Sequence, residues 1–248
     1  MTASEILLTH KSIRKYKDKP IERELLEKII ATSCRASTTG NMQVYSVVNT
    51  TDITLKQRLA PAHFNQKMVL TAPNVLTFCA DFNRFKRWCY ANDAVPGYDN
   101  FLSFMTAAID VLLVSQNVAM IAEEYGLGIC YLGTTLYNAD SIIDILNLPK
   151  GVVPITTLTI GWPDESPELT DRLPIEAILH QETYCDYSEV KIREIYNEKE
   201  SLPENINFVK INNKSSLAQI FTDIRYTRKD NEYFSEKLFA VLKSQGFM

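Results

Sequence analysis

The side chains best suited to bind an anion lie in the segment His10-Lys-Ser-Ile-Arg14, called here the basic segment. It places three potential cations and a hydroxyl close together in a chain whose formal net charge is −4. Charge-assisted hydrogen bonds from such groups to phosphate or carboxylate are strong. The segment therefore predicts a site for a small anion. A solvated basic helix end is the competing interpretation, because Lys and Arg are mostly exposed.

Other kinds of chemistry find little support in the sequence. The three histidines, His10, His63 and His180, lack metal-ligand spacing, so no metal site is predicted. No nucleophile motif of the G-x-S-x-G kind and no Walker phosphate loop is present. Gly126-Leu-Gly128 follows a predicted helix instead of a strand, which excludes a dinucleotide fingerprint. What remains is a cationic site of phosphate size beside groups that can hydrogen-bond a flat polar ring, which favours a flavin.

Composition limits the class of partner. The chain has 248 residues, of which 46% are hydrophobic and 23% charged, as in an ordinary globular protein. A balance of 26 Lys and Arg against 30 Asp and Glu argues against binding to nucleic acid or to an anionic membrane. Five cysteines without a C-x-x-C pair, and no visible secretory signal, predict a cytoplasmic protein.

The most apolar stretch, residues 107–122, predicts a buried helix. It carries Asp110 and Ser115 and is shorter than the roughly 20 apolar residues that a membrane span needs. Apolar side chains occur around nearly its whole circumference, so a thick core or a second subunit must cover it. A homodimer would supply that cover.

Hydrophobic periodicity and turn residues predict the order of the elements. Helices are expected at residues 5–9, 22–33, 53–59, 66–70, 107–122, 141–146, 175–180 and 231–245. Strands are expected at residues 45–48, 74–80, 129–132 and 152–160, whereas residues 82–104 are expected to be irregular. Without a regular β-α-β rhythm, this order favours an α+β fold. We expect a core over residues 1–184 and a C-terminal extension over 185–248 that packs on the core or on a partner subunit.

Motifs along the chain resemble those of the FMN-dependent nitroreductase superfamily. The basic segment and the following Lys15-Tyr-Lys-Asp-Lys-Pro20 resemble its opening motif. Further resemblances follow in sequence order at residues 35–43, 66–67, 78–84, 125–133, 161–163 and 172–174. The resemblance is closest to the NADPH-preferring, oxygen-insensitive nitroreductase and flavin reductase branch. It implies a mixed or antiparallel sheet flanked by helices, and a homodimer with interlocked termini and FMN at its interface.

The resemblance also implies a set of FMN-binding residues: His10, Lys11, Ser12, Arg14, Thr38, Thr39, Gly40, Asn41, Gln66, Tyr131, Leu132, Gly133, Thr134 and Arg172. The basic segment would hold the phosphate and ribityl oxygens, with Arg172 closing from the far side. Gln66 would bind the pyrimidine edge, and residues 38–41 would come from the partner subunit. Residues 131–134 would pass along the isoalloxazine ring. No catalytic side chain is implied, because flavin N5 carries the hydride.

The implied activity is hydride transfer from NADPH or NADH to a nitroaromatic, quinone or flavin. A specialised reductase on the same fold, for example in reductive dehalogenation, and a non-enzymatic FMN-holding protein remain alternatives.

Several positions depart from the family pattern. Thr170 stands where a relative often has lysine, Thr134 replaces a glycine of the flavin-edge turn, and Tyr137 replaces a polar residue near the acceptor pocket. Three further cations are candidates for the 2′-phosphate of NADPH, or else belong to a basic surface helix end: Arg225, Arg228 and Lys229.

Overall fold

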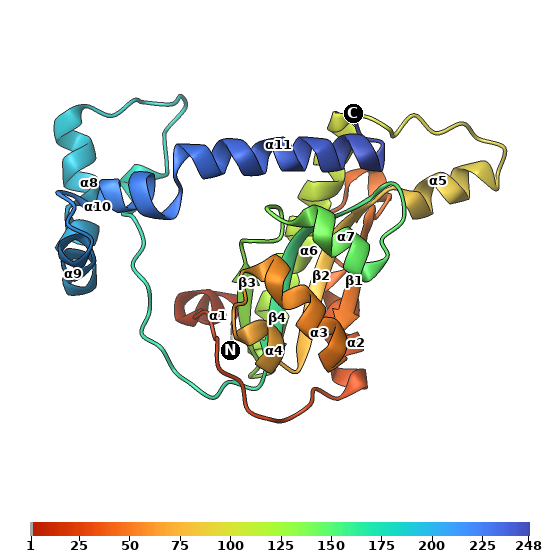
Figure 1. Ribbon diagram of the computed structural model, residues 1–248, viewed down its shortest axis with the longest axis horizontal. Helices are drawn as coiled ribbons and strands as arrows, with labels where there is room; N and C mark the ends of the chain where they lie inside the picture. Colours follow the sequence, from red (N-terminus) through yellow and green to blue (C-terminus); the bar gives the residue numbers. More distant parts are fainter. Residues whose placement is uncertain (1) are drawn as a thin grey trace. The chain divides into compact units, whose positions relative to one another are not determined.

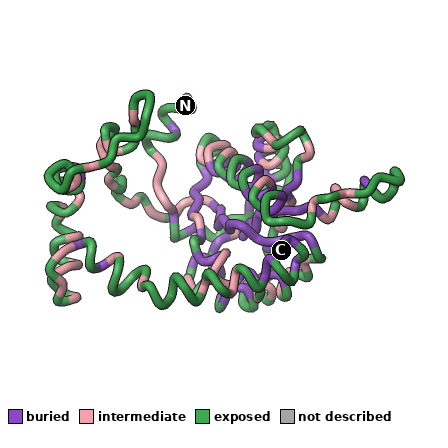
Figure 2. The backbone as a smooth tube through the Cα atoms, turned by 90° about the horizontal axis from the view of Figure 1, so that it is seen from above, coloured by how far each residue is buried: buried purple, intermediate pink, exposed green. Residues whose placement is uncertain are grey.

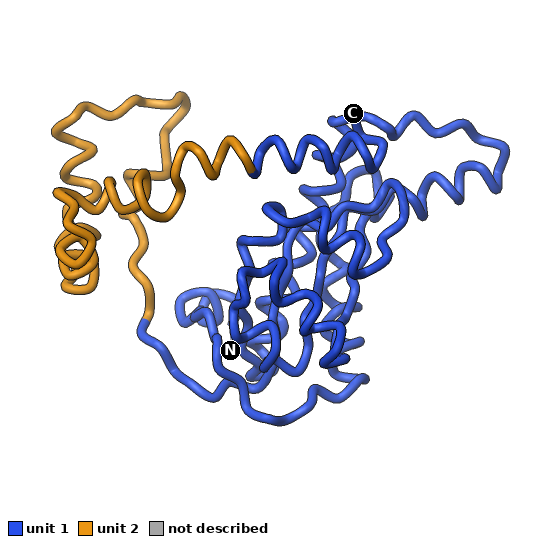
Figure 3. The backbone as a smooth tube through the Cα atoms, in the orientation of Figure 1, with its two compact units in different colours: residues 1–168, 234–248 blue, residues 169–233 orange. Residues whose placement is uncertain are grey.

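A computed structural model describes residues 2–248. These residues form two compact units, one running up to Glu168 and including Phe234–Met248, the other being Leu169–Tyr233 (Figure 3). The division into independent domains at residue 184 stays a prediction. The first unit contains all the residues predicted to bind FMN except Arg172.

The first unit is built on a four-stranded antiparallel sheet with the strand order β1-β2-β4-β3. The strands are β1 (Tyr45–Thr50), β2 (Asn74–Asp81), β3 (Gly128–Leu132) and β4 (Val152–Gly161). In the register of the sheet, Leu76 of β2 lies opposite Leu158 of β4. Every residue of β2 and β4 is buried. These two central strands are therefore covered on both faces, which confirms the α+β fold expected from the sequence.

One face of the sheet is covered by the long helix α6 (Phe101–Glu124), which contacts all four strands (Figure 1). The side chain of Asn100 caps its first turn by accepting a hydrogen bond from the Ser103 amide. Helix α2 (Arg23–Ser33) packs on α6, and the fully buried Ile29 belongs to the same core. The predicted buried helix is thus confirmed, with a start six residues earlier than expected.

The opposite face carries a layer of short helices (Figure 1). They are α3 (Ile53–Leu59), the 3-10 turn η2 (Ala60–His63), α4 (Met68–Thr71) and α7 (Ala139–Leu146). Leu59, Val69 and Ile142 are fully buried there beside Leu132 of β3. Figure 2 shows the buried residues gathered in one part of the molecule, close to the C-terminus. This layer carries Gln66 and adjoins the turn after β3.

The remaining helices lie outside these layers. They are α1 (Ala3–Thr9), α5 (Asn83–Tyr90), α8 (Glu189–Ser201), α9 (Pro203–Ile211), α10 (Leu217–Ile220) and α11 (Arg228–Gln245). Single turns of other helical types occur at η1 (Thr39–Asn41), η3 (Ile175–Ala177) and η4 (Phe221–Arg225). Helix α11 ends in the core of the first unit, where Val241, Leu242 and Phe247 are buried.

Three local predictions were wrong. Residues 83–90 form α5 although 82–104 was expected to be irregular, because apolar residues at 85, 88 and 89 have helical spacing. Helix α7 begins after Asn138 and not at Ser141, since Ala139 is already buried in the core. The expected helix at 175–180 is only one 3-10 turn.

Helices α8 and α9 were missed because their apolar periodicity is weak. Ser188 caps α8 by accepting from the Lys191 amide, and Arg193 forms an i,i+4 ion pair with Glu189 at 2.6 Å. Caps and such pairs each stabilise a helix by only a few tenths to about 1 kcal/mol. In a segment rich in charged residues, such weak signals are easily missed in the sequence.

Helix α6 alone among the described helices is long and apolar enough to span a membrane. Half of its most apolar window is buried inside the protein. Because it also contacts every strand of the sheet, we interpret it as a core helix that keeps one face open.

Candidate functional site

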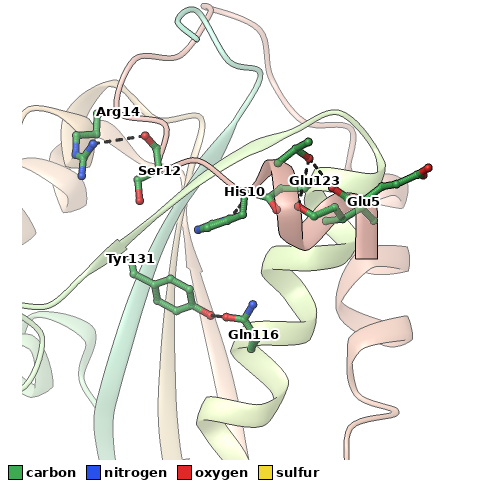
Figure 4. Close-up of polar contacts among 9 residues, drawn as sticks. Glu5, His10, Ser12, Arg14, Gln116, Glu123 and Tyr131 are labelled. Carbon is green, nitrogen blue, oxygen red and sulfur yellow. Dashed lines mark hydrogen bonds and ion pairs between the residues drawn. The ribbon is translucent and has the colours of Figure 1, made fainter. Parts of the chain in front are cut away.

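The basic segment lies directly beside strand β3. Ser12 forms a parallel bridge with Ile129, and the Ile13 amide donates to the Ile129 carbonyl at 2.8 Å. Close approach depends on Gly128, because a Cβ there would lie 2.6 Å from Cγ1 of Ile13. Two parts of the predicted FMN site, residues 10–14 and 131–134, are thus carried by neighbouring segments (Figure 4).

The segment after strand β4 holds the basic segment from the other side. The Lys17 amide donates to the Trp162 carbonyl at 2.8 Å, and the Asp164 amide donates to the Lys15 carbonyl at 3.0 Å. The buried Tyr16 hydroxyl donates to the Ile13 carbonyl at 2.7 Å, and burial raises the pKa of Tyr16. The backbone that carries the cations is therefore fixed along most of its length.

Two cations of the basic segment have no carboxylate partner among residues 2–248. Lys11 Nζ lies 3.5 Å from Ser166 Oγ, and the Arg14 guanidinium contacts only the Ser12 carbonyl, at 3.5 Å (Figure 4). Both are at least partly exposed to solvent. They are free to meet an anion.

His10 differs from these two cations, because its Nδ1 lies 2.7 Å from Oε1 of Glu123. Burial raises the pKa of Glu123, and the hydrogen bond with His10 acts against that rise. Only Nε2 of His10 remains for a ligand.

A second carboxylate, Glu165, was not predicted at this place. Its Oε1 accepts hydrogen bonds from the backbone amides of Arg14 at 2.6 Å and Lys15 at 3.1 Å. These two backbone donors are therefore occupied and are not open to an incoming anion. The negative charge of Glu165 also opposes anion binding.

The turn after β3 is tied to the segment that carries Gln66. His63 Nδ1 lies 2.9 Å from Thr134 Oγ1, and Asn138 Nδ2 donates to the Ala62 carbonyl at 2.8 Å. A Cβ added to Gly133 would meet no atom within 4 Å. The turn thus presents open space where a flat ring can approach the backbone.

At the end of strand β3, the side chains of Tyr131 and Leu132 point into the protein and not into the open space over Gly133. The Tyr131 hydroxyl donates to Ser115 Oγ at 3.3 Å and to Gln116 Oε1 at 3.4 Å, both on α6 (Figure 4). Burial raises the pKa of Tyr131. Leu132 is buried in the core beneath the sheet. The side chains of Tyr131 and Leu132 are therefore engaged within the protein, and the contribution of residues 131–134 to flavin binding stays a prediction.

The loop at residues 38–41 is held by Asp110 of helix α6, a residue that the sequence did not mark as functional. Its buried carboxylate accepts from Thr38 Oγ1 at 2.5 Å, from the Thr39 amide at 3.0 Å and from Thr39 Oγ1 at 3.3 Å. Gly40 and Asn41 both have φ of 56°. The only sign of this role in the sequence was the position of Asp110, an acidic residue within the most apolar predicted helix.

Arg172 lies in the second unit, and its part in the phosphate site stays a prediction. Its guanidinium donates to Thr170 Oγ1 at 2.7 Å and to the Asp171 carbonyl at 2.9 Å. Thr170, where a cation was expected, therefore orients Arg172.

The three candidate cations for NADPH have ordinary surface environments. Arg225 lies over the ring of Phe208 at 4.6 Å, and Arg228 lies 3.8 Å from Glu232. The side chain of Lys229 makes no hydrogen bond or ion pair with any described residue, and the role of all three cations stays a prediction.

Two cavities bear on where a cofactor could bind. One of about 670 Å³ is lined only by residues of the second unit, including Leu173, Tyr196 and Phe221. Since no residue predicted to bind FMN lines it, it is not the predicted flavin site. A smaller one of about 230 Å³ lies beside Lys11 and Glu165. It falls below the roughly 300 Å³ at which small-molecule pockets begin.

Comparisons with known proteins show the family of the chain. Residues 7–162 match the model of the nitroreductase family. The chain is 37% identical over 180 residues to the oxygen-insensitive NADPH nitroreductase of Salmonella typhimurium, covering 73% of each chain. The NADPH:FMN oxidoreductase of Vibrio harveyi, solved with NAD+, has a TM-score of 0.77 at 27% identity and covers 99% of this chain and 98% of its own. A structure from Bacteroides fragilis reaches a TM-score of 0.97 at 56% identity, covering 98% of this chain and 99% of that one.

Proposed function

The chain belongs to the nitroreductase family, and from this premise we propose that it passes hydride from NADPH or NADH to a nitroaromatic, quinone or flavin acceptor. It is an FMN-dependent NAD(P)H oxidoreductase. When bound, FMN supplies N5 as the atom that accepts and returns hydride, so the protein need not supply an acid or a base. The role of the protein is to bind and orient FMN and to shield it from solvent.

One observation supports the proposal most strongly: two cations without a carboxylate partner lie near a turn whose backbone is open to a ligand. Lys11 and Arg14 have no carboxylate partner among the described residues, and they lie on a segment that bridges β3. Gly133, at the end of the same strand, leaves space above its backbone. These residues fit FMN, since a phosphate needs cations and a flat ring needs open backbone.

We assign the predicted residues to parts of the cofactor on this basis. Lys11 and Arg14 bind the phosphate, and Arg14 contributes most because a planar guanidinium can donate two parallel hydrogen bonds. Ser12 and Nε2 of His10 serve the phosphate and ribityl oxygens. Gln66 serves the pyrimidine edge, and the backbone of residues 133–134 serves the ring.

We further propose that the chain acts as a homodimer. Helix α6 exposes large apolar side chains at helical spacing: Phe101, Leu102, Met105, Ile109 and Leu112. A contiguous exposed apolar stripe of this kind marks an interaction surface. Asp110, adjacent to Ile109, anchors the loop at 38–41, so this loop lies where a partner subunit could receive it.

The proposed location is the cytoplasm. All five cysteines are free in the described part of the chain, and free thiols persist in a reducing compartment. The acidic charge balance disfavours nucleic acid and anionic membranes as partners.

The test begins with the purified protein, expressed with ample riboflavin. A yellow protein that releases FMN on denaturation supports the assignment, and a protein that takes up no FMN refutes it. Stopped-flow mixing with NADPH and NADH then measures loss of the flavin absorbance. Rapid bleaching followed by reoxidation with a nitroaromatic or quinone is expected. Stable FMN without bleaching would indicate an FMN-holding protein, and reoxidation by halogenated aromatics alone would indicate the specialised reductase.

A further inference from the structure

His63 has an environment that packing alone does not explain. It is fully buried at the end of the turn η2, three residues before Gln66. Its Nδ1 lies 2.9 Å from Thr134 Oγ1, whereas its Nε2 is buried and has no partner within residues 2–248. A buried polar atom without a partner is costly, and an aliphatic side chain would avoid that cost. The imidazole must therefore contribute something that an aliphatic group cannot.

The tautomer follows from the two ring nitrogens. Burial lowers the pKa of His63 to about 4, so the ring is neutral at physiological pH. If the proton were on Nε2, a buried N–H would have no acceptor, and such orphaned donors are rare. With the proton on Nδ1, His63 donates to Thr134 Oγ1 and leaves only a lone pair unpaired. Thr134 then keeps its own hydroxyl proton for another acceptor.

We propose that His63 is a positioning residue for FMN: its Nδ1–H fixes the hydroxyl of Thr134 as a hydrogen-bond donor to the flavin and holds the Gly133–Thr134 turn in the geometry that binds the ring. The proposal rests on the proposed FMN function. It also explains why a threonine is suitable at 134, where the resembling family has glycine. Unlike glycine, threonine carries a hydroxyl that His63 can orient.

The experiment measures FMN dissociation constants by titrating apo-protein and following flavin fluorescence. Thr134→Val removes the hydroxyl at nearly constant shape, and we expect it to weaken FMN binding about tenfold, the effect of losing one hydrogen bond. His63→Leu should weaken binding by a similar factor. The double variant should bind FMN as tightly as the single variant with the lower affinity, because both substitutions remove the same interaction.

Conservative variants and a matched control separate positioning from general stability. Thr134→Ser keeps the hydroxyl and should bind FMN within twofold of the wild type. Thr50→Val is the control, since Thr50 is also buried in the first unit but its hydroxyl has no partner; it should leave FMN affinity unchanged. If His63→Leu does not fold, the Thr134 variants still test whether the Thr134 hydroxyl contributes to FMN binding.

Two results would overturn the proposal: FMN binding by Thr134→Val within twofold of the wild type, or a 15N spectrum showing the His63 proton on Nε2. Wild-type protein that binds no FMN would instead refute the proposed function, so the two failures are distinguishable.

Discussion

The loop at residues 38–41 should depend on one carboxylate, and Asp110→Asn tests this dependence. The buried Asp110 accepts three hydrogen bonds from Thr38 and Thr39. An asparagine of the same shape offers one oxygen, and its NH2 group faces at least one donor. Hydrogen bonds to a charged group contribute about 1.5–3 kcal/mol each, and unpaired buried donors add their own cost. We expect the free energy of unfolding to fall by about 2–4 kcal/mol.

Urea unfolding and FMN titration together provide the assay for Asp110→Asn. If the loop serves the cofactor of the partner subunit, FMN affinity should also fall, at a protein concentration where the dimer persists by sedimentation. Asp52→Asn is the matched control. Asp52 also accepts a backbone N–H, from Leu55, but at an exposed helix N-cap where asparagine serves equally well. Equal stability of Asp110→Asn and wild type would refute the reasoning.

Other perturbations test the remaining parts of the site. Arg14→Ala should weaken FMN binding by about 1.5–3 kcal/mol, the value of a charged hydrogen bond, and Arg14→Lys should recover only part of it; unchanged affinity by titration would count against the phosphate role. Glu165→Gln should strengthen FMN binding at low ionic strength, because it removes an opposing charge, and the gain should shrink as salt is raised. Gly128→Ala should destabilise the fold by about 1–3 kcal/mol in urea, since its Cβ would clash with Ile13. The pKa of His63 is lowered from 6.5 to about 4, so its contribution is complete above pH 6.5 and is lost as the pH falls towards 4. Relative to His63→Leu, the wild type should lose up to about 3 kcal/mol over that range, and parallel stability curves for the two proteins would contradict this.

Local strings of sequence were sufficient to propose most of the candidate site residues. The basic segment and the turn at Gly133 are short motifs. The turn follows the strand that the periodicity predicted, and the basic segment lies between the first two predicted helices. Their contact could not be derived in the same way. It depends on the register between Ser12 and Ile129, which Gly128 permits by lacking a side chain. A glycine in the sequence does not indicate which residue will pack against it, so the contact between Gly128 and Ile13 could not be predicted.

The residues that sequence reasoning missed act over long separations. Asp110 lies 72 positions from Thr38, and Glu165 lies 151 positions from Arg14. Spacing rules for helices and strands connect residues a few positions apart, so they cannot pair such groups. The same applies to His63 and Thr134, which are 71 positions apart.

The balance of charge at the basic segment explains why these missed residues matter. Lys11 and Arg14 together supply two positive charges, close to the charge of about −1.5 to −2 on a phosphate monoester at neutral pH. Glu123 contacts His10, whereas Glu165 accepts hydrogen bonds from backbone amides and adds a carboxylate close to Arg14. The described first unit therefore provides little excess positive charge for a dianion. We therefore predict that tight phosphate binding needs a further cation. Arg172, which Thr170 orients within the second unit, stays the residue that the family motif predicts for this role.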